Sequence, residues 1–163
     1  VAGRVKVVAG TGANSTAEAI HLTESAEKLG ADASLLVAPY YNKPSQDGLF
    51  EHFSQIARSV KIPLILYSIP GRCGIEIGVE TVRRLAEANP NIVSIKEAGG
   101  NSDRVSQLMD AVKKPGFTIL SGDDPRNACR GALVDLVRVV NNIAVCPALA
   151  WVRDVPLIAW GWG

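Results

Sequence analysis

The chain has 163 residues, a formal net charge of +1 and 47% hydrophobic residues, which is typical of one folded domain or a large piece of one. Because Lys, Arg, Asp and Glu are interspersed, the sequence offers neither a basic face for nucleic acid nor a polybasic membrane anchor. No apolar run approaches the roughly 18 residues of a spanning helix and no signal segment opens the chain, so we expect a cytoplasmic protein that acts on small molecules.

Five short apolar runs predict β-strands, and segments with helical patterning lie between them. The first helix is expected to follow the capping residues Asn14 and Ser15 and to end at Gly30. Continuous apolar runs of this length are typical of parallel strands that are buried on both faces. The predicted strands are residues 5–9, 33–37, 63–67, 92–95 and 117–120, and the other predicted helices are residues 46–59, 79–88 and 102–112.

Each predicted strand is followed by a polar or glycine-rich cluster, and successive strands start about 28 residues apart, the size of one βα unit. An open doubly wound sheet and a (β/α)8 barrel both fit this spacing. A barrel gathers the carboxyl ends of all its strands around one mouth, so polar clusters after every strand favour the barrel. Because closed barrels run to about 250 residues, we predict an α/β chain that forms a partial (β/α)8 (TIM) barrel.

Most residues that could bind a metal or cofactor have spacings that favour structural roles. Gly10–Asn14 lacks the third glycine of a dinucleotide loop, and Ser121–Asp124 is expected to form a turn or helix cap. His21 and His52 have no partner at ligand spacing, so we expect ordinary surface or interface histidines. The cysteines have neither disulfide nor zinc spacing and are expected to be reduced packing residues: Cys73, Cys129 and Cys146. We expect neither a metal nor a cofactor.

Lys96 is different because it follows an apolar strand in the centre of the repeat. Partial burial is expected to lower its pKa and to favour the neutral amine, which can attack a carbonyl to form a Schiff base. Tyr67 ends the preceding strand at the same depth and could shuttle protons. Arg72 follows in a Pro-Gly-Arg turn, where its planar guanidinium suits a substrate carboxylate. The three residues together indicate carbonyl chemistry on an anionic keto acid.

Five segments, taken in order and spacing, resemble the dihydrodipicolinate synthase family of pyruvate-dependent class I aldolases. The resemblance implies a (β/α)8 barrel, no cofactor, and condensation of pyruvate with L-aspartate-4-semialdehyde in lysine (diaminopimelate) biosynthesis. It also implies a homotetramer built from tight dimers. The segments are Gly10-Thr-Gly-Ala-Asn14, Pro39-Tyr-Tyr-Asn-Lys-Pro44, Tyr67-Ser-Ile-Pro-Gly-Arg72, Ile95-Lys-Glu-Ala98 and Ser121-Gly-Asp-Asp124.

The resemblance also implies residue roles. Lys96 would form the Schiff base with pyruvate, and Tyr67 would relay protons to it. Tyr41 would complete the relay by reaching into the site of a neighbouring subunit. The residues implied in binding are Arg72 for the carboxylate of the aldehyde, Gly122 for lining the pocket, and Asn14, Glu18 and Tyr40 for a feedback lysine site at the dimer interface.

The resemblance covers about residues 1–125, which we predict to be a catalytic domain with about strands 3 to 7 of the barrel. Residues 126–163 hold all three tryptophans but no lysine or glutamate, which predicts a divergent or out-of-frame tail. The pattern of residues 133–145 fits an apolar helix or a strand. Because an open barrel exposes strand edges, we expect this chain by itself to have little activity.

Two alternatives share part of this pattern. An N-acetylneuraminate lyase or a keto-sugar-acid aldolase would share the lysine and tyrosine, although Arg72 and the tandem Tyr40-Tyr41 favour the synthase. A non-catalytic flavodoxin-like binding module is the alternative from another class, with Lys96 as a solvated strand end.

Overall fold

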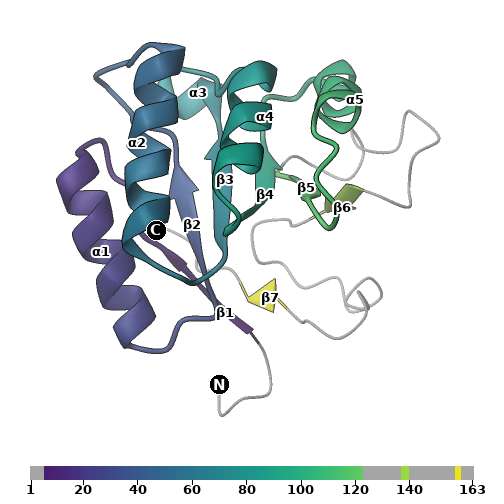
Figure 1. The fold of residues 1–163 in the computed structure, drawn as a ribbon. Coiled ribbons are helices and arrows are strands. Elements are labelled where there is room, and N and C mark those ends of the chain that lie inside the picture. Colours follow the sequence, from purple (N-terminus) through teal and green to yellow (C-terminus); the bar gives the residue numbers. More distant parts are fainter. Residues whose placement is uncertain (1–5, 123–136, 140–156, 159–163) are drawn as a thin grey trace.

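The computed structural model describes residues 6–122, 137–139 and 157–158 (Figure 1). Strands and helices alternate along the chain as predicted. In chain order the elements are β1 Lys6–Gly10, α1 Thr16–Lys28, β2 Ala33–Val37, α2 Gln46–Ser59, β3 Leu64–Ser68, α3 Pro70–Cys73, α4 Val79–Ala88, β4 Ile92–Glu97, α5 Ser102–Ala111, β5 Thr118–Ser121, β6 Val137–Val139 and β7 Leu157–Ile158.

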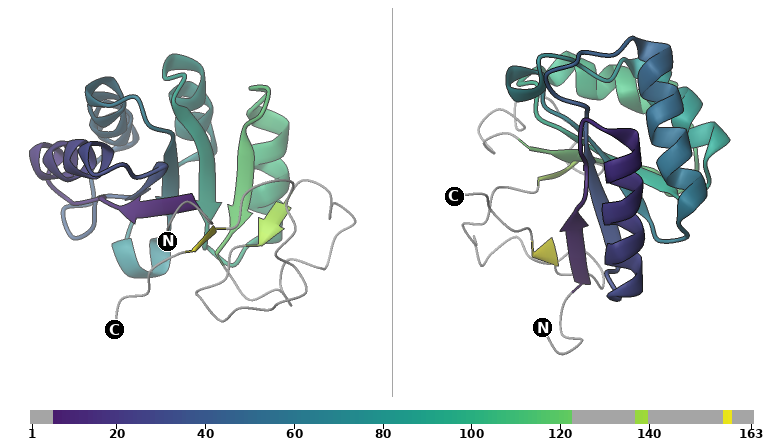
Figure 2. Two further views of the ribbon diagram at one scale, coloured as in Figure 1. Left: turned by 90° about the horizontal axis from the view of Figure 1, so that it is seen from below. Right: turned by 90° about the vertical axis from the view of Figure 1, so that its left-hand side faces the viewer.

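The strands form a single parallel sheet in the order β6-β5-β4-β3-β2-β1-β7. Helices α1, α2, α4 and α5 lie on the same side of this curved sheet (Figures 1 and 2). Consecutive strands from β1 to β5 are neighbours, and each pair is joined by a crossover that contains a helix. This arrangement confirms the predicted α/β class and fits part of a (β/α)8 barrel.

The helices begin at the residues that the sequence suggests. The Ser15 and Ser45 hydroxyls accept hydrogen bonds from the backbone N–H groups of Glu18 and Gly48, at 3.4 and 3.2 Å, and so cap α1 and α2. Gly30 ends the α1 region with a φ of 82°, a conformation that favours glycine. Side-chain capping therefore sets where α1 and α2 begin.

The core lies between the helices and the sheet. Its largest fully buried side chains come from α2, β2, β3, β4, α4, α5 and the segment before α4: Phe53, Leu36, Leu49, Ile56, Leu64, Leu66, Ile77, Leu85, Ile92, Ile95, Leu108 and Val82. On α2 the buried residues Leu49, Phe53 and Ile56 follow the spacing of one helical face. This packing holds the carboxyl ends of β3 and β4 in place.

Burial of the strands differs from the expectation that all five are covered on both faces. β3 and β4 are buried along almost their whole length, but β2 alternates between buried and half-buried residues. In β1, Lys6, Val7 and Gly10 are exposed. The reason is position, since β3 and β4 lie at the centre of the sheet whereas β1 lies towards its edge.

Two further differences concern the site. β4 continues to Glu97, so Lys96 lies inside a strand rather than in the turn after it, because β4 pairs with β3 and β5 as far as Glu97. The predicted Pro-Gly-Arg turn forms the short helix α3, which Pro70 begins and Gly74 ends with a φ of 69°.

Only short parts of residues 126–163 are described. β6 pairs with β5, which selects the strand alternative for residues 137–139, and β7 pairs with β1. The rest of the predicted tail lies outside the described residues, so the boundary at residue 125 stays a prediction.

Candidate active site

Lys96 lies on β4, between β3 and β5, and is 7% exposed. Its Cα is paired in register with that of Tyr67 on β3 and with that of Leu120 on β5. The Lys96 Nζ lies 4.4 Å from the centroid of the Tyr67 ring. The structure therefore brings together the lysine and the tyrosine that the sequence predicts at one depth.

The surroundings of Lys96 restrict its amine. The residue is buried, and the face of the Tyr67 ring lies beside its Nζ. A lysine in this setting is held in one place and kept away from bulk water. Both properties suit an amine that attacks a bound carbonyl carbon.

Gly122 packs directly against the lysine stem. A Cβ at this position would lie 2.9 Å from Lys96 Cε and 2.7 Å from Ala98 Cβ. The Gly122 N–H donates a hydrogen bond of 2.7 Å to the Glu97 carbonyl oxygen, which holds the chain after β5 against the end of β4. A side chain here would displace Lys96 or Ala98, while the role of Gly122 in lining a pocket stays a prediction.

Arg72 lies on α3, directly after β3, and its side chain is exposed. Its backbone N–H donates to the Ile69 carbonyl oxygen at 3.0 Å. Lys43, from the loop after β2, reaches over the same turn, since a Cβ on Gly74 would lie 2.9 Å from Lys43 Cε. Two cationic side chains thus belong to one end of the sheet, as a site for an anionic substrate requires.

Tyr40 and Tyr41 occupy the loop after β2 and are 43% and 91% exposed. The Tyr41 backbone has a φ of 73°, a left-handed conformation that is rare for residues other than glycine. Neither ring is buried in its own chain. Within one copy of the chain, Tyr41 is thus exposed, whereas Lys96 is buried and Tyr67 is half-buried.

The same loop lies beside the predicted lysine-binding residues. The Asn42 side-chain amide donates to the Asn14 backbone carbonyl oxygen at 3.1 Å. Glu18 is exposed in the first turn of α1, shortly after Asn14. Glu18 and Tyr40 are therefore exposed and Asn14 is half-buried, while their role in lysine binding stays a prediction.

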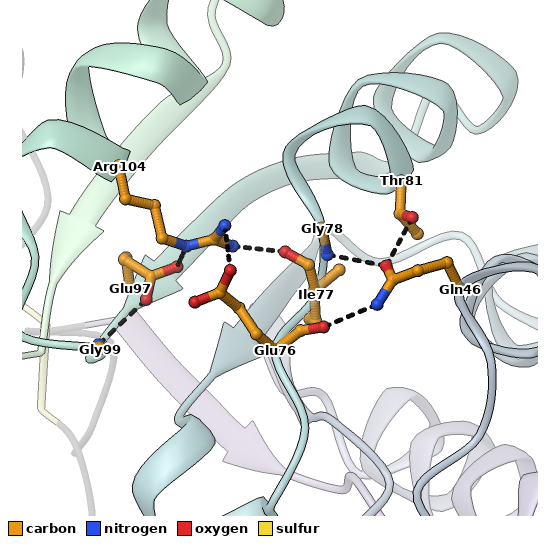
Figure 3. A network of polar contacts seen from close by, with 8 residues as sticks. All are labelled: Gln46, Glu76, Ile77, Gly78, Thr81, Glu97, Gly99 and Arg104. Atoms are coloured by element: carbon orange, nitrogen blue, oxygen red, sulfur yellow. Dashed lines mark hydrogen bonds and ion pairs between the residues drawn. The ribbon is translucent and has the colours of Figure 1, made fainter.

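A buried ionic network behind Lys96 is not apparent from the sequence (Figure 3). Arg104 on α5 pairs with Glu97 at 2.8 Å and with Glu76 at 2.8 Å. Glu97 and Arg104 are 3% and 5% exposed. Burial raises the pKa of Glu97, and the hydrogen bond and charge of Arg104 act in the opposite direction. The one available sequence signal is a glutamate directly after Lys96, with an arginine seven residues later.

His52 is a second feature that the sequence does not predict. His21 is exposed as expected, but His52 is 5% exposed, and its Nδ1 lies 2.8 Å from Thr16 Oγ1. Burial lowers the pKa of His52 to about 4. The signal was its place at helical spacing from Leu49 and Ile56, on the buried face of α2.

No group of three or more His, Cys, Asp or Glu side chains is placed to hold a metal ion in the part of the chain that the structure describes. Cys73 is a buried free thiol, whereas Cys129, Cys146, Asp123 and Asp124 lie outside that part. None of the described helices is long and apolar enough to cross a membrane.

The parallel sheet with helices on one side and a buried lysine at the carboxyl end of a central strand define a protein of the (β/α)8-barrel class. A sequence model described as the "Dihydrodipicolinate synthetase family" matches residues 1–134. The chain belongs to this family.

Individual relatives agree with the family. A 4-hydroxy-tetrahydrodipicolinate synthase from Pseudomonas putida is 57% identical over 125 residues, which are 77% of this chain and 42% of that protein. The solved structure of the synthase from Methylacidiphilum fumariolicum has 64% identity and a TM-score of 0.74, covering 76% of this chain and 41% of that one. The chain thus spans about two fifths of the length of these relatives.

One further solved structure bears on the site. It is a chloride-inhibited dihydrodipicolinate synthase from Acinetobacter baumannii in complex with pyruvate, with 53% identity and a TM-score of 0.72. It covers 75% of this chain and 41% of that one.

Proposed function

We propose that this chain carries the part of a 4-hydroxy-tetrahydrodipicolinate synthase active site that contains the Schiff-base lysine. This enzyme is a lyase that condenses pyruvate with L-aspartate-4-semialdehyde in lysine biosynthesis. The observation that carries the proposal is the buried Lys96 at the carboxyl end of β4, with Tyr67 in register beside it and Gly122 against its stem. The relatives named as this synthase, and the relative in complex with pyruvate, support this choice of substrate.

In the proposed first step, the neutral Lys96 amine attacks the keto carbon of pyruvate. The new C–N bond gives a carbinolamine, and the former carbonyl oxygen leaves as water once it has gained protons. Tyr67, whose ring centroid lies 4.4 Å from Lys96 Nζ, would transfer these protons through its phenol. Loss of a methyl proton then gives an enamine, which attacks the aldehyde carbon of the second substrate. No cofactor is needed, because the lysine imine itself accepts the electron pair.

The other predicted residues act at the periphery of this site. We propose that Arg72, exposed on α3, holds the carboxylate of aspartate-semialdehyde. Tyr41, exposed on the loop after β2, would extend the proton relay of a neighbouring subunit within a homotetramer of tight dimers. Asn14, Glu18 and Tyr40 would form a feedback lysine site at that interface. We also propose that the enzyme works in the cytoplasm.

Reductive trapping tests the reaction class. Incubation with pyruvate and borohydride should add one reduced pyruvate to Lys96, located by mass spectrometry of the digested protein. The Lys96→Arg variant should gain no adduct. Lys114→Arg is the matched control, because burial lowers the pKa of Lys114 but its amine contacts backbone carbonyl oxygens. An unmodified Lys96 in folded protein would favour the non-catalytic binding module.

Substrate choice needs a second measurement, because N-acetylneuraminate lyase and keto-sugar-acid aldolases would form the same adduct. Turnover is therefore measured separately with aspartate-semialdehyde and with sugar aldehydes. Consumption of a sugar aldehyde in preference to aspartate-semialdehyde would overturn the synthase assignment. Little turnover is the result that the sequence predicts for this chain by itself.

A further inference from the structure

We propose that Arg104 is a positioning residue: it fixes the segment 69–78, which carries Arg72, against the end of β4, which carries Lys96. The role assigned to these two residues rests on the proposed function. The link itself rests on the network behind the site, in which α5, the end of β4 and the segment before α4 meet (Figure 3).

The guanidinium of Arg104 contacts two separate segments at once. Its Nε donates to Glu97 Oε2 at 2.8 Å, and one terminal nitrogen donates to Glu76 Oε1 at 2.8 Å. The other terminal nitrogen donates to the Ile77 carbonyl oxygen. Because the guanidinium is planar and rigid, these three contacts define the position of residues 76 and 77 relative to β4.

Glu97, which accepts the hydrogen bond from Arg104, is the residue next to Lys96 on β4. Successive residues of a strand point to opposite faces, so Glu97 faces α5 while Lys96 faces the Tyr67 ring on the other side. Glu97 Oε1 also accepts a hydrogen bond of 3.0 Å from the Gly99 N–H. The carboxylate thus holds both Arg104 and the turn that follows β4.

Gln46 holds the same segment from the other side. Its amide nitrogen donates to the Glu76 carbonyl oxygen at 2.9 Å, and its amide oxygen accepts from the Gly78 N–H at 2.8 Å. The segment between α3 and α4 is therefore held by α5 and by the start of α2. Arg72 lies four residues before Glu76, so its place is set by this double hold.

Stability alone is a poor explanation for a buried ion pair at this position. Desolvation of two charges offsets much of their attraction, and apolar replacements of similar volume are often neutral or stabilising. Charged groups, in contrast, join two segments through hydrogen bonds of defined direction. Arg104 and Glu97 supply that geometry at the one place where the lysine strand and the Arg72 segment approach α5.

The test compares two pairs of variants. Arg104→Gln breaks the link, whereas Glu76→Ala removes its ion pair and leaves the contact to the Ile77 carbonyl oxygen. Glu76 is half-exposed, so its loss leaves the core intact. Arg83→Gln and Glu80→Ala are the matched controls, because they break an Arg–Glu pair on the outer face of α4. If Arg104→Gln does not fold, Glu76→Ala decides the proposal through the loss of the ion pair alone.

The first readout is limited trypsin digestion, which does not depend on any reaction. Cleavage after Arg72 requires local opening of α3. We expect the rate to rise at least about ten-fold in both test variants relative to their controls, since contacts to charged groups are lost. Cleavage within about two-fold of the controls in the test variants would overturn the proposal.

The second readout is pyruvate trapping at Lys96, analysed as a rate constant and a final yield. Poor positioning of the strand end lowers the rate constant at saturating pyruvate while the yield stays full, whereas partial unfolding lowers the yield. We expect Arg104→Gln to lower the rate constant by about three-fold to ten-fold relative to Arg83→Gln. A full-yield adduct formed at the control rate would overturn the positioning role.

Failure of the proposed function gives a different pattern. If the unmodified chain forms no adduct at Lys96, the Schiff-base assignment is lost, and digestion after Arg72 alone decides whether Arg104 holds the segment. If the adduct forms normally and digestion is unchanged in the test variants, the positioning proposal is lost and the Schiff-base assignment stands.

Discussion

The loops after β2 and β3 both follow the carboxyl ends of neighbouring parallel strands, but they are built in opposite ways. The segment 69–78 after β3 is held by Arg104 on one side and by Gln46 on the other. The loop after β2 presents Tyr40 and Tyr41 to the outside, and its backbone is left-handed at Tyr41 and Lys43.

The difference shows which part of the site the chain completes by itself. The segment after β3 is held by groups of the same chain, so it can orient Arg72 within one copy. An exposed tyrosine on a left-handed backbone position is instead a feature that favours a role outside its own chain. This contrast supports the proposal that Tyr41 serves a neighbouring subunit, and it can be tested by changing each side of the comparison.

The largest effect is expected at Gly12, which lets the chain after β1 lie against β2 just before the exposed loop. A Cβ at Gly12 would lie 2.3 Å from the Val37 backbone nitrogen, so Gly12→Ala must move β2. We expect a loss of about 3 kcal/mol in the free energy of unfolding, measured by urea denaturation. Gly10→Ala is the control, because nothing lies within 4 Å of its Cβ position, and equal losses in both variants would contradict the packing argument.

The next effect is the pH dependence of stability that His52 adds where α2 contacts Thr16 of α1. The pKa of His52 is about 4 in the folded chain, and an unfolded histidine has a pKa of about 6.5. The unfolded state therefore binds more protons between these values. The contribution of His52 to the free energy of unfolding is therefore fully present above about pH 6.5. It is lost as the pH falls towards 4, by about 2 to 3 kcal/mol.

The measurement is the free energy of unfolding from pH 7 to pH 4 for the unmodified chain and for His52→Asn. An asparagine can keep a hydrogen bond to Thr16 Oγ1 but does not titrate. The variant should lose less stability over this range. If the free energy of unfolding depends on pH in the same way in both proteins, the pKa of His52 does not differ between the folded and unfolded states.

A smaller effect is expected when the segment 69–78 loses its hydrogen bonds to Gln46, one of the two residues that hold it. Gln46→Ala removes the hydrogen bonds to Glu76 and Gly78, and the one that Thr81 donates at 2.7 Å. We expect a loss of about 1 to 2 kcal/mol in the free energy of unfolding. Gln55→Ala, at an exposed position of the same helix, is the control and should change it by less than about 0.5 kcal/mol.

The smallest effect is a gain in stability in the exposed loop. Tyr41→Gly replaces a tyrosine at φ 73° with the residue that adopts this conformation without a steric penalty. Because the tyrosine is 91% exposed, little packing is lost, and we expect a gain of about 0.5 to 1 kcal/mol. Tyr40→Gly lacks this relief and should not stabilise the chain. A destabilised Tyr41→Gly variant would show that Tyr41 is held within its own chain.

Sequence patterns predicted most of the local structure. The helices at 46–59 and 79–88 and the strand at 33–37 have the predicted bounds, because apolar spacing and capping residues act over a few residues. The extent of β4 was missed by two residues, since its last pairs depend on β3 and β5 rather than on its own polar residues. The predicted burial of β1 was too high, because an apolar strand near the edge of a sheet has the same sequence pattern as a central strand.

The candidate site divides in the same way. The apolar run before Lys96 and the strand end at Tyr67 were determined by sequence, and a regular βα repeat is enough to place them at one depth. The predicted turn at Arg72 is instead the short helix α3. Only the tertiary structure decided that Gly122 packs on the lysine stem, that Arg104 joins Glu97 to Glu76, and that His52 is buried. Those contacts join residues from separate βα units, and the free energy of such contacts exists only once the helices have packed on the sheet.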